Sequence, residues 1–189
     1  QTFPDSGLLA VGTATGSSGK IIQMESGRLI LPMWHFALPR TPVGCMYSDD
    51  DGETWTLGAS VEAPTPGSIN ESAVAEYAPG KLIWVVRYSG NSDVRVLLRS
   101  EDGGETVVLD RMEPDLGGYV CAPNLIKVQN TLMYMGPTDL RVGWRTRSRM
   151  IISYDGGLNW KVRSGMFEDS RYIGYSCLED LGGGLYCVA

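Results

Sequence analysis

The densest group of chemically active side chains in this sequence is a run of four arginines. The stretch LRVGWRTRSR, residues 140–149, contains no acidic residue and holds Arg141, Arg145, Arg147 and Arg149. A guanidinium group binds a carboxylate or a phosphate through paired, charge-assisted hydrogen bonds. One interpretation of the run is therefore a site for an anion. The alternative is an edge strand whose arginines face the solvent.

The cysteines and acidic residues do not form a metal-binding pattern. The chain has one histidine and no C-x-x-C pair among Cys45, Cys121, Cys177 and Cys187, so a zinc site is not expected. The acidic run 49–51 lacks the ligand spacing of an EF-hand calcium loop. We therefore predict no metal and no other cofactor. Cys177 and Cys187 flank a hairpin turn and could lie opposite each other, but we favour buried free thiols.

A repeated turn organises the chain. SDDDGETW at residues 48–55 returns as SEDGGETV at 100–107 and as SYDGGLNW at 153–160, at intervals of 52 and then 53 residues. The aspartate of each copy can accept hydrogen bonds from turn amides, and the glycine can adopt a positive φ. A tryptophan closes the first and third copies and is expected to fold back as an apolar plug. The turn is thus predicted to be structural and not catalytic.

Short apolar runs flank these turns and indicate strands. Stretches rich in Val, Ile, Leu and Tyr include residues 28–35, 81–88, 148–153 and 173–180. Three to four short strands in a unit of about 50 residues is the period of a β-propeller blade. The 24 glycines and 10 prolines also favour an all-β chain with many turns. We predict one partial propeller domain over residues 1–189, with about three and a half blades at this period.

Charge and hydropathy exclude two classes of partner. The net charge of −6 argues against binding to nucleic acid. No apolar run approaches the roughly 20 residues that a membrane-spanning helix needs. A function on small or extracellular ligands therefore fits the sequence better than one on nucleic acid or inside a bilayer.

The repeated turn is the Asp-box, and four further stretches make the chain resemble the sialidases (neuraminidases), which are six-bladed Asp-box propellers. In family order they are GKIIQMESGRLILP (19–32), NESAVAEYAPGKLIWVVR (70–87), WRTRSRMIISYDGG (144–157) and RYIGYSCLEDLGGGLYCV (171–188). The resemblance implies a sialidase-type propeller with about three to four blades present. It also implies the activity of an exo-α-sialidase, which removes terminal sialic acid from glycoconjugates.

The resemblance assigns roles to four residues. Tyr175 matches the catalytic nucleophile, and Glu71 matches the glutamate that activates it. Arg87 matches the middle arginine of the triad that binds the substrate carboxylate. Arg145 matches the last arginine of that triad, with Arg141 and Arg147 as alternatives in neighbouring registers.

These residue types suit the chemistry that the family performs. A carboxylate nucleophile would be repelled by the carboxylate of a sialoside, whereas a neutral tyrosine is not, and an adjacent glutamate can take its proton. Sialidases are for this reason an exception to the two-carboxylate scheme of glycosidases. The reaction implied is hydrolysis with retention of configuration, through a covalent sialyl-tyrosine.

Two parts of the family's site are not found in the sequence. The first triad arginine belongs to an F/Y-R-I-P motif, which does not occur here, and the family's acid catalyst is usually an aspartate. Both precede the stretch with which this chain begins. We therefore expect the middle of a sialidase catalytic domain, completed by missing segments or by a second chain and showing little turnover alone.

Three other functions stay open. A trans-sialidase uses the same residues and replaces water with a sugar acceptor. A non-catalytic sialoglycan-binding propeller, or a purely structural Asp-box propeller, does not need an activated phenol, so Tyr175 and Glu71 together argue against both. The expected partner is a sialylated glycan. The expected location is extracellular, at the cell surface or in the secretory compartment.

Overall fold

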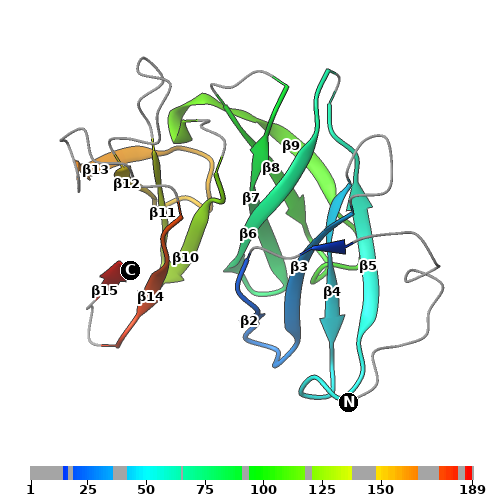
Figure 1. Cartoon of the computed structure of the whole chain (residues 1–189). Coiled ribbons are helices and arrows are strands. Elements are labelled where there is room, and N and C mark those ends of the chain that lie inside the picture. Colours follow the sequence, from blue (N-terminus) through cyan, green and yellow to red (C-terminus); the bar gives the residue numbers. More distant parts are fainter. Residues whose placement is uncertain are drawn as a thin grey trace.

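The computed structural model describes residues 15–16, 19–35, 42–64, 66–90, 94–117, 121–137, 148–165, 175–182 and 186–188. These residues form three antiparallel sheets of four or five strands and one hairpin, as Figure 1 shows. Within the second and third sheets, strands that follow one another in the sequence are hydrogen-bonded neighbours. Each sheet is one propeller blade, so the all-β propeller expected from the sequence is confirmed for this part of the chain.

The first blade has an inner strand in two pieces. β1 and β2 both pair with β3, on the edge opposite to the one that pairs with β4. The strands of this blade are β1 (Thr15–Gly16), β2 (Ile22–Gln23), β3 (Leu29–His35), β4 (Val43–Ser48) and β5 (Thr56–Val61). Two short strands thus share the place that one longer strand fills in each of the next two blades.

The second and third blades are continuous four-stranded meanders, and the last hairpin contributes an inner strand to a fourth blade. The second blade consists of β6 (Ile69–Ala78), β7 (Lys81–Tyr88), β8 (Arg95–Ser100) and β9 (Val108–Glu113), followed by the 3-10 turn η2 (Pro114–Leu116). The third consists of β10 (Asn124–Val128), β11 (Thr131–Pro137), β12 (Ser148–Ser153) and β13 (Lys161–Gly165). The hairpin is β14 (Leu178–Asp180) with β15 (Tyr186–Val188).

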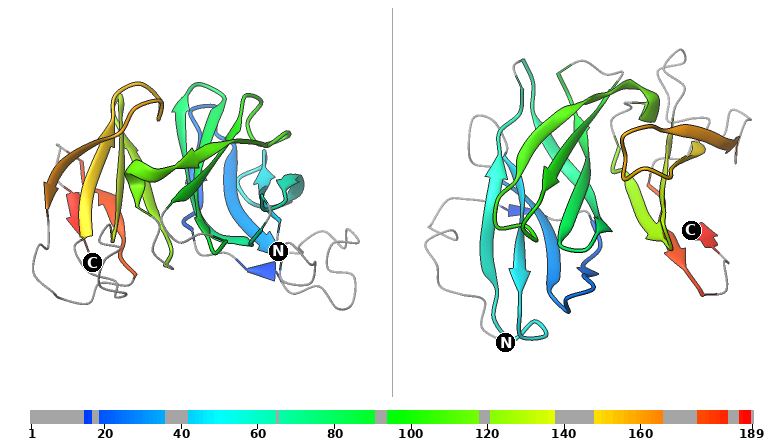
Figure 2. Two further views of the ribbon diagram at one scale, coloured as in Figure 1. Left: turned by 90° about the horizontal axis from the view of Figure 1, so that it is seen from above. Right: turned by 180° about the vertical axis from the view of Figure 1, so that it is seen from behind.

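The second blade is buried on both faces. Its strand β7 contains the uninterrupted apolar run 82–86, in which every residue is fully buried. Because successive side chains of a strand point to opposite faces, Trp84 packs into a core shared with the first blade. Its neighbour Ile83 packs into a core shared with the third blade. Figure 2 shows the three sheets side by side in this order.

The repeated turns occupy equivalent places in three blades. Each joins the third strand of a blade to the fourth, at Ser48, Ser100 and Ser153. In the third copy the Ser153 hydroxyl accepts the Gly157 amide at 2.8 Å, and Asp155 accepts the Asn159 amide at 2.9 Å. The side chain of Asn159 and the turn amides lower the pKa of Asp155 to about 2. The polar groups of the motif thus form their hydrogen bonds within the turn.

Arginines fasten these turns to the preceding blade. Arg28 stacks on the ring of Tyr47 at 4.2 Å and donates to the carbonyl of Gly103, at 3.1 Å, in the turn of the second blade. Arg99 stacks on Tyr77 at 4.8 Å and donates to the carbonyl of Gly156, at 2.9 Å, in the turn of the third blade. The two glycines hold the same place in the motif and have φ angles of 67° and 69°.

Two details of the sequence interpretation need correction. Arg149 lies in β12, which pairs with β11 and β13, so it is not on an edge strand, while Arg141, Arg145 and Arg147 fall outside the described residues. The strand expected over residues 173–180 begins only at Leu178, so Tyr175 precedes it in irregular backbone.

The expectation that Cys177 and Cys187 could lie opposite each other is wrong, because the partner of Cys187 across the hairpin is Glu179. The expected buried free thiols are found at Cys45 and Cys121, whereas Cys177 is a free thiol that is only half-buried. Burial raises the pKa of Cys45 to about 12. Among the described residues, no three side chains of His, Cys, Asp or Glu gather as metal ligands, and no helix has the length and hydropathy of a membrane span.

Candidate active site

A bulge in the second blade turns Glu71 toward Arg87. In the ladder between β6 and β7, Ile69 pairs with Tyr88 and Ser72 pairs with Val86. Two residues of β6, Asn70 and Glu71, therefore oppose the single residue Arg87 of β7. A β-bulge of this kind redirects side chains and bends its strand. The Asn70 side chain caps the bulge, because its Oδ1 accepts the Glu71 amide at 2.8 Å.

Glu71 and Arg87 form a largely buried ion pair. Arg87 Nη1 donates to Glu71 Oε2 at 2.7 Å, and the two side chains are 19% and 13% exposed. The Nε of Arg87 is buried and has no hydrogen-bond partner among the described residues. A buried donor without a partner is costly and uncommon in folded proteins, and such groups are found at functional sites.

The second oxygen of Glu71 binds the phenol of Tyr175. Tyr175 Oη donates to Glu71 Oε1 at 2.7 Å, across 104 residues of sequence, and the tyrosine is 57% exposed. One carboxylate thus accepts a phenolic proton donor on one oxygen and a guanidinium on the other. A carboxylate within 2.6–3.2 Å of a hydroxyl can act as its general base, and the charge-assisted hydrogen bond from the guanidinium fixes the position of that carboxylate.

Side chains from two other blades anchor the segment that follows Tyr175. Asn124, at the start of β10, donates through Nδ2 to Ser176 Oγ at 2.9 Å. Lys20, just before β2, donates to the carbonyl of Leu178 and to the carboxylate of Glu179. Burial is the largest single influence on the pKa of Lys20 and lowers it, but the hydrogen bonds and charges of Glu179 and Cys177 together outweigh burial, so the pKa of Lys20 is raised.

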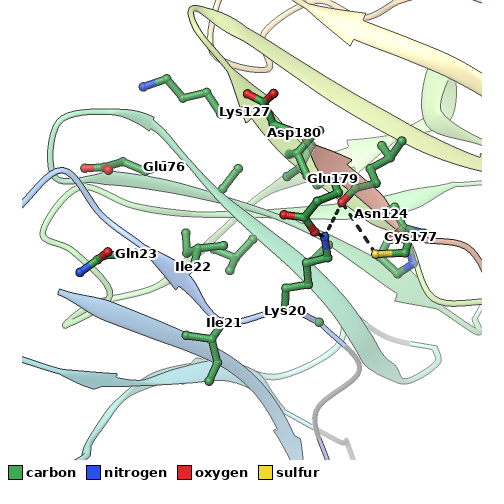
Figure 3. Close-up of a pocket in the computed structure, with 18 of the residues that line it drawn as sticks. Lys20, Ile21, Ile22, Gln23, Glu76, Asn124, Lys127, Cys177, Glu179 and Asp180 are labelled. Carbon is green, nitrogen blue, oxygen red and sulfur yellow. Dashed lines mark hydrogen bonds and ion pairs between the residues drawn. The ribbon is translucent and has the colours of Figure 1, made fainter. Parts of the chain in front are cut away.

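A cavity of about 700 Å³ adjoins this group. It lies between the inner strands β2, β6, β10 and β14, and Ser176 and Cys177 belong to its wall. In Figure 3, Lys20 reaches toward Glu179, and Cys177 and Asn124 lie beside them. Tyr175, Glu71 and Arg87 do not line this cavity, and its wall holds instead the anchoring residues Lys20, Asn124 and Ser176.

The structure brings three of the four sequence-predicted residues together, namely Tyr175, Glu71 and Arg87. The fourth, Arg145, lies outside the described residues. Sequence reasoning missed Asn124 and Lys20. Asn124 stands in none of the recognised stretches, and Lys20 falls inside the family-like stretch 19–32 without an assigned role. Their contacts span 52 and 158 residues of sequence, so no local pattern could have assigned them a place in the site.

Comparison with known proteins gives one family model and one curated relative. The model described as BNR/Asp-box repeat matches residues 46–57, which contain the first turn. The anhydrosialidase of Macrobdella decora is 36% identical over 104 residues, which are 52% of this chain and 12% of that protein. The chain therefore spans a small part of the length of this relative.

Solved sialidase structures share the fold. The Hadza microbial sialidase Hz136 aligns with a TM-score of 0.72 and 26% identity, over 88% of this chain and 33% of its own. The NanB sialidase from Streptococcus pneumoniae, in complex with 2-[(3-chlorobenzyl)ammonio]ethanesulfonate, aligns with a TM-score of 0.73 and 18% identity, over 89% and 26%. A mutant of Trypanosoma rangeli sialidase that displays trans-sialidase activity aligns with a TM-score of 0.67 and 22% identity, over 84% and 26%.

Proposed function

From the premise that the chain has the fold of part of a sialidase-type Asp-box propeller, we propose that it is part of the catalytic domain of a retaining exo-α-sialidase. The observation that supports this proposal best is the 2.7 Å hydrogen bond from Tyr175 Oη to Glu71 Oε1. A lectin or a structural propeller has no need to hold a phenol on a carboxylate that a guanidinium also binds. Tyr175, Glu71 and Arg87 suit the step that we propose, which is the attack of a tyrosine oxygen on the sugar.

In the proposed reaction, the Tyr175 oxygen attacks the anomeric carbon of a terminal sialic acid. The phenolic proton passes to Glu71, and a sialyl-tyrosine forms as the bond from the anomeric carbon to the aglycone oxygen breaks. The aglycone leaves as an alcohol, because its oxygen takes a proton from the general acid that the family resemblance implies and that was not found in this sequence. Water then attacks the same carbon from the opposite face and gives a proton to the conjugate base of that acid, while the phenolate recovers its proton from Glu71. Two inversions give net retention of configuration.

Arg87 has two roles in this proposal. Its hydrogen bond to Glu71, at 2.7 Å, holds the base in position for the attack. Its remaining donors suit the carboxylate that a sialoside carries on the anomeric carbon, because a guanidinium can bind a carboxylate at more than one point. We propose Arg145 as a second arginine for the same carboxylate, on the strength of its place in the sequence motif.

Trans-sialidase activity is the second candidate. The mutant Trypanosoma rangeli sialidase displays trans-sialidase activity on a similar fold, so the same propeller supports transfer to a sugar as well as to water. The two reactions share the sialyl-tyrosine and differ only in the acceptor. Product analysis with and without added galactosides separates them.

Terminal sialic acids lie on glycoconjugates outside the cytosol, so we propose an extracellular, cell-surface or secretory location. The sialylated glycan is the proposed partner. Fractionation of the source cells, with the protein detected by antibody, tests this part of the proposal independently of catalysis.

A covalent probe tests the nucleophile. We expect 2,3-difluorosialic acid to label Tyr175, because fluoride leaves the anomeric carbon without needing an acid catalyst and the second fluorine slows hydrolysis. The assay uses the natural polypeptide that carries these 189 residues, and peptide mass spectrometry locates the label. Tyr175→Phe should abolish labelling while the variant keeps its thermal stability. Tyr154→Phe, at a similarly exposed tyrosine in the third Asp-box turn, should label like the unsubstituted protein. A label on another residue, or none, contradicts the proposal.

A further inference from the structure

Tyr175 has little backbone support of its own. It lies in irregular backbone three residues before β14, a strand of only three residues, and more than half of its surface is exposed. A side chain in such a segment occupies one position only if neighbouring groups hold the segment. Contacts made by the residues that follow Tyr175 therefore help to hold the phenol on Glu71.

The anchor nearest in sequence to Tyr175 comes from Asn124 of the third blade. The amide of Asn124 donates to Ser176 Oγ at 2.9 Å, and Ser176 is the residue directly after Tyr175. The two bonds from Lys20 reach further along the chain, to Leu178 and Glu179. Fixing Ser176 therefore restricts the backbone unit that carries the tyrosine more directly than the lysine does.

Asn124 is itself held rigidly. It pairs with Met135 at the beginning of the β10–β11 ladder. Just before it, the carbonyl of Cys121 accepts Arg95 Nη1 at 2.8 Å, and Arg95 is fully buried and also donates to Tyr134 Oη at 3.1 Å. The entry to β10 is thus tied to the second blade, which also carries Glu71. The base and the anchor of the nucleophile rest on one rigid frame.

We propose that Asn124 is a positioning residue, which holds the Tyr175 phenol at Glu71 through its hydrogen bond to Ser176. This inference rests on the proposed function. Asn124 touches neither the phenol nor the carboxylate, so its effect is on geometry and not on proton affinity. Loss of the bond lets the phenol leave its attack position, and a displacement of about 1 Å can cost up to about 100-fold in rate. Substrate binding through arginine is unaffected.

The test separates binding from attack by labelling with 2,3-difluorosialic acid. The dependence of labelling rate on probe concentration gives KI, the concentration for half-saturation, and kinact, the rate constant of the bound probe. We expect Asn124→Ala to lower kinact by about 10- to 100-fold and to leave KI within about twofold. Asn130→Ala, at an exposed asparagine in the turn after β10, is the matched control and should change neither constant.

The partner residue and a rescue variant show whether the bond itself is responsible. Ser176→Ala should lower kinact as much as Asn124→Ala does, and the double variant no further, because both remove one interaction. Asn124→Asp should restore kinact to within about threefold, since the Ser176 hydroxyl can donate to a carboxylate. The rescue should disappear when Ser176→Ala is added.

The possible outcomes are distinct. If Asn124→Ala labels with an unchanged kinact, or if both constants shift together in step with lost thermal stability, the positioning role is wrong and the proposed function stands. If the unsubstituted protein is not labelled at Tyr175, the proposed function fails and this inference falls with it. Ser176→Ala removes only one oxygen, so its kinact decides the question even if Asn124→Ala does not fold.

Discussion

Glu71 divides its two oxygens between two partners. The guanidinium of Arg87 donates to one oxygen at 2.7 Å, and the Tyr175 phenol donates to the other, also at 2.7 Å. The bulge at Asn70 and Glu71 makes this double contact possible, because it gives the glutamate a direction that a regular ladder would not allow.

Arg87→Ala should weaken binding of sialic acid by about 10- to 100-fold. A hydrogen bond to a charged group contributes roughly 1.5–3 kcal/mol, and each 1.4 kcal/mol is a tenfold change in Kd. Isothermal titration calorimetry measures the change, and Arg163→Ala, at an exposed arginine of β13, should bind like the unsubstituted protein. An unaltered Kd for Arg87→Ala, with the fold retained by circular dichroism, would remove Arg87 from the carboxylate site.

At the scale of elements, the second and third Asp-box turns each close their own blade and receive an arginine from the blade before. The turns are repeated in the sequence, but their arginines are not. Arg28 lies just before β3 of the first blade, whereas Arg99 lies in β8 of the second. Two different positions thus deliver a stacked guanidinium to the same carbonyl of the motif. The contact between a stacked arginine and the turn of the next blade is thus repeated in the structure, although the two arginines stand at different positions in their blades.

Arg99→Ala should destabilise the protein by about 1.5–3 kcal/mol, the range for hydrogen bonds to a charged group, with a contribution from lost stacking on Tyr77. Arg99→Lys should recover part of this loss, because lysine keeps the charge without the planar fork. Chemical denaturation at neutral pH gives both values. Arg163→Ala serves again as the control, with an expected change within about 0.5 kcal/mol. Equal stability of Arg99→Ala and Arg163→Ala would show that the contacts of Arg99 contribute nothing to the free energy of unfolding.

The third Asp-box turn should make stability depend on pH in acid. The folded-state pKa of Asp155 is lowered from 3.8 to about 2, so its contribution is present above about pH 4 and is lost as the pH falls toward about 2. Asp155→Asn should lower Tm at neutral pH and reduce the further fall in Tm between about pH 5 and pH 2. Asp51→Asn, at an exposed aspartate of the first turn, should follow the unsubstituted protein. If the Tm of Asp155→Asn falls between about pH 5 and pH 2 as steeply as that of the unsubstituted protein, Asp155 is not the source of the acid sensitivity.

The sequence predicted elements better than it predicted the site. Ser48, Ser100 and Ser153 begin equivalent turns because the motif forms its hydrogen bonds locally, and local chemistry is visible in a sequence. The strand expected over residues 173–180 was too long, since residues 175–177 are not in a strand and only residues 178–180 pair with β15. Glu71 and Tyr175 were identified from family resemblance alone. Asn124 was missed because its partner lies 52 residues away.

At the scale of the whole molecule, the second blade couples its neighbours. Two adjacent residues of β8 show this directly. Leu98 is buried in the core shared with the first blade, and Leu97 is buried in the core shared with the third. A blade that contributes to two cores cannot open on one face without weakening the other. We therefore expect the described blades to unfold together.

Leu97→Ala and Leu98→Ala form a matched pair for this expectation. Each should destabilise by about 2–5 kcal/mol, the usual range for truncating a buried leucine. In hydrogen exchange, each should raise exchange rates in the first and the third blade alike. Faster exchange in the first blade only for Leu98→Ala, and in the third only for Leu97→Ala, would mean that the blades are separate cooperative units.

The 104 residues between Glu71 and Tyr175 also set a delay during biosynthesis. Ribosomes add roughly 5–20 residues per second, so Glu71 is made about 5–20 seconds before Tyr175, and Glu113, the last residue of the second blade, about 3–12 seconds before it. During that interval the nascent chain holds Glu71 and Arg87 without Tyr175. Under the proposed function, a polypeptide whose synthesis stops before Tyr175 has no nucleophile and leaves sialylated glycans intact.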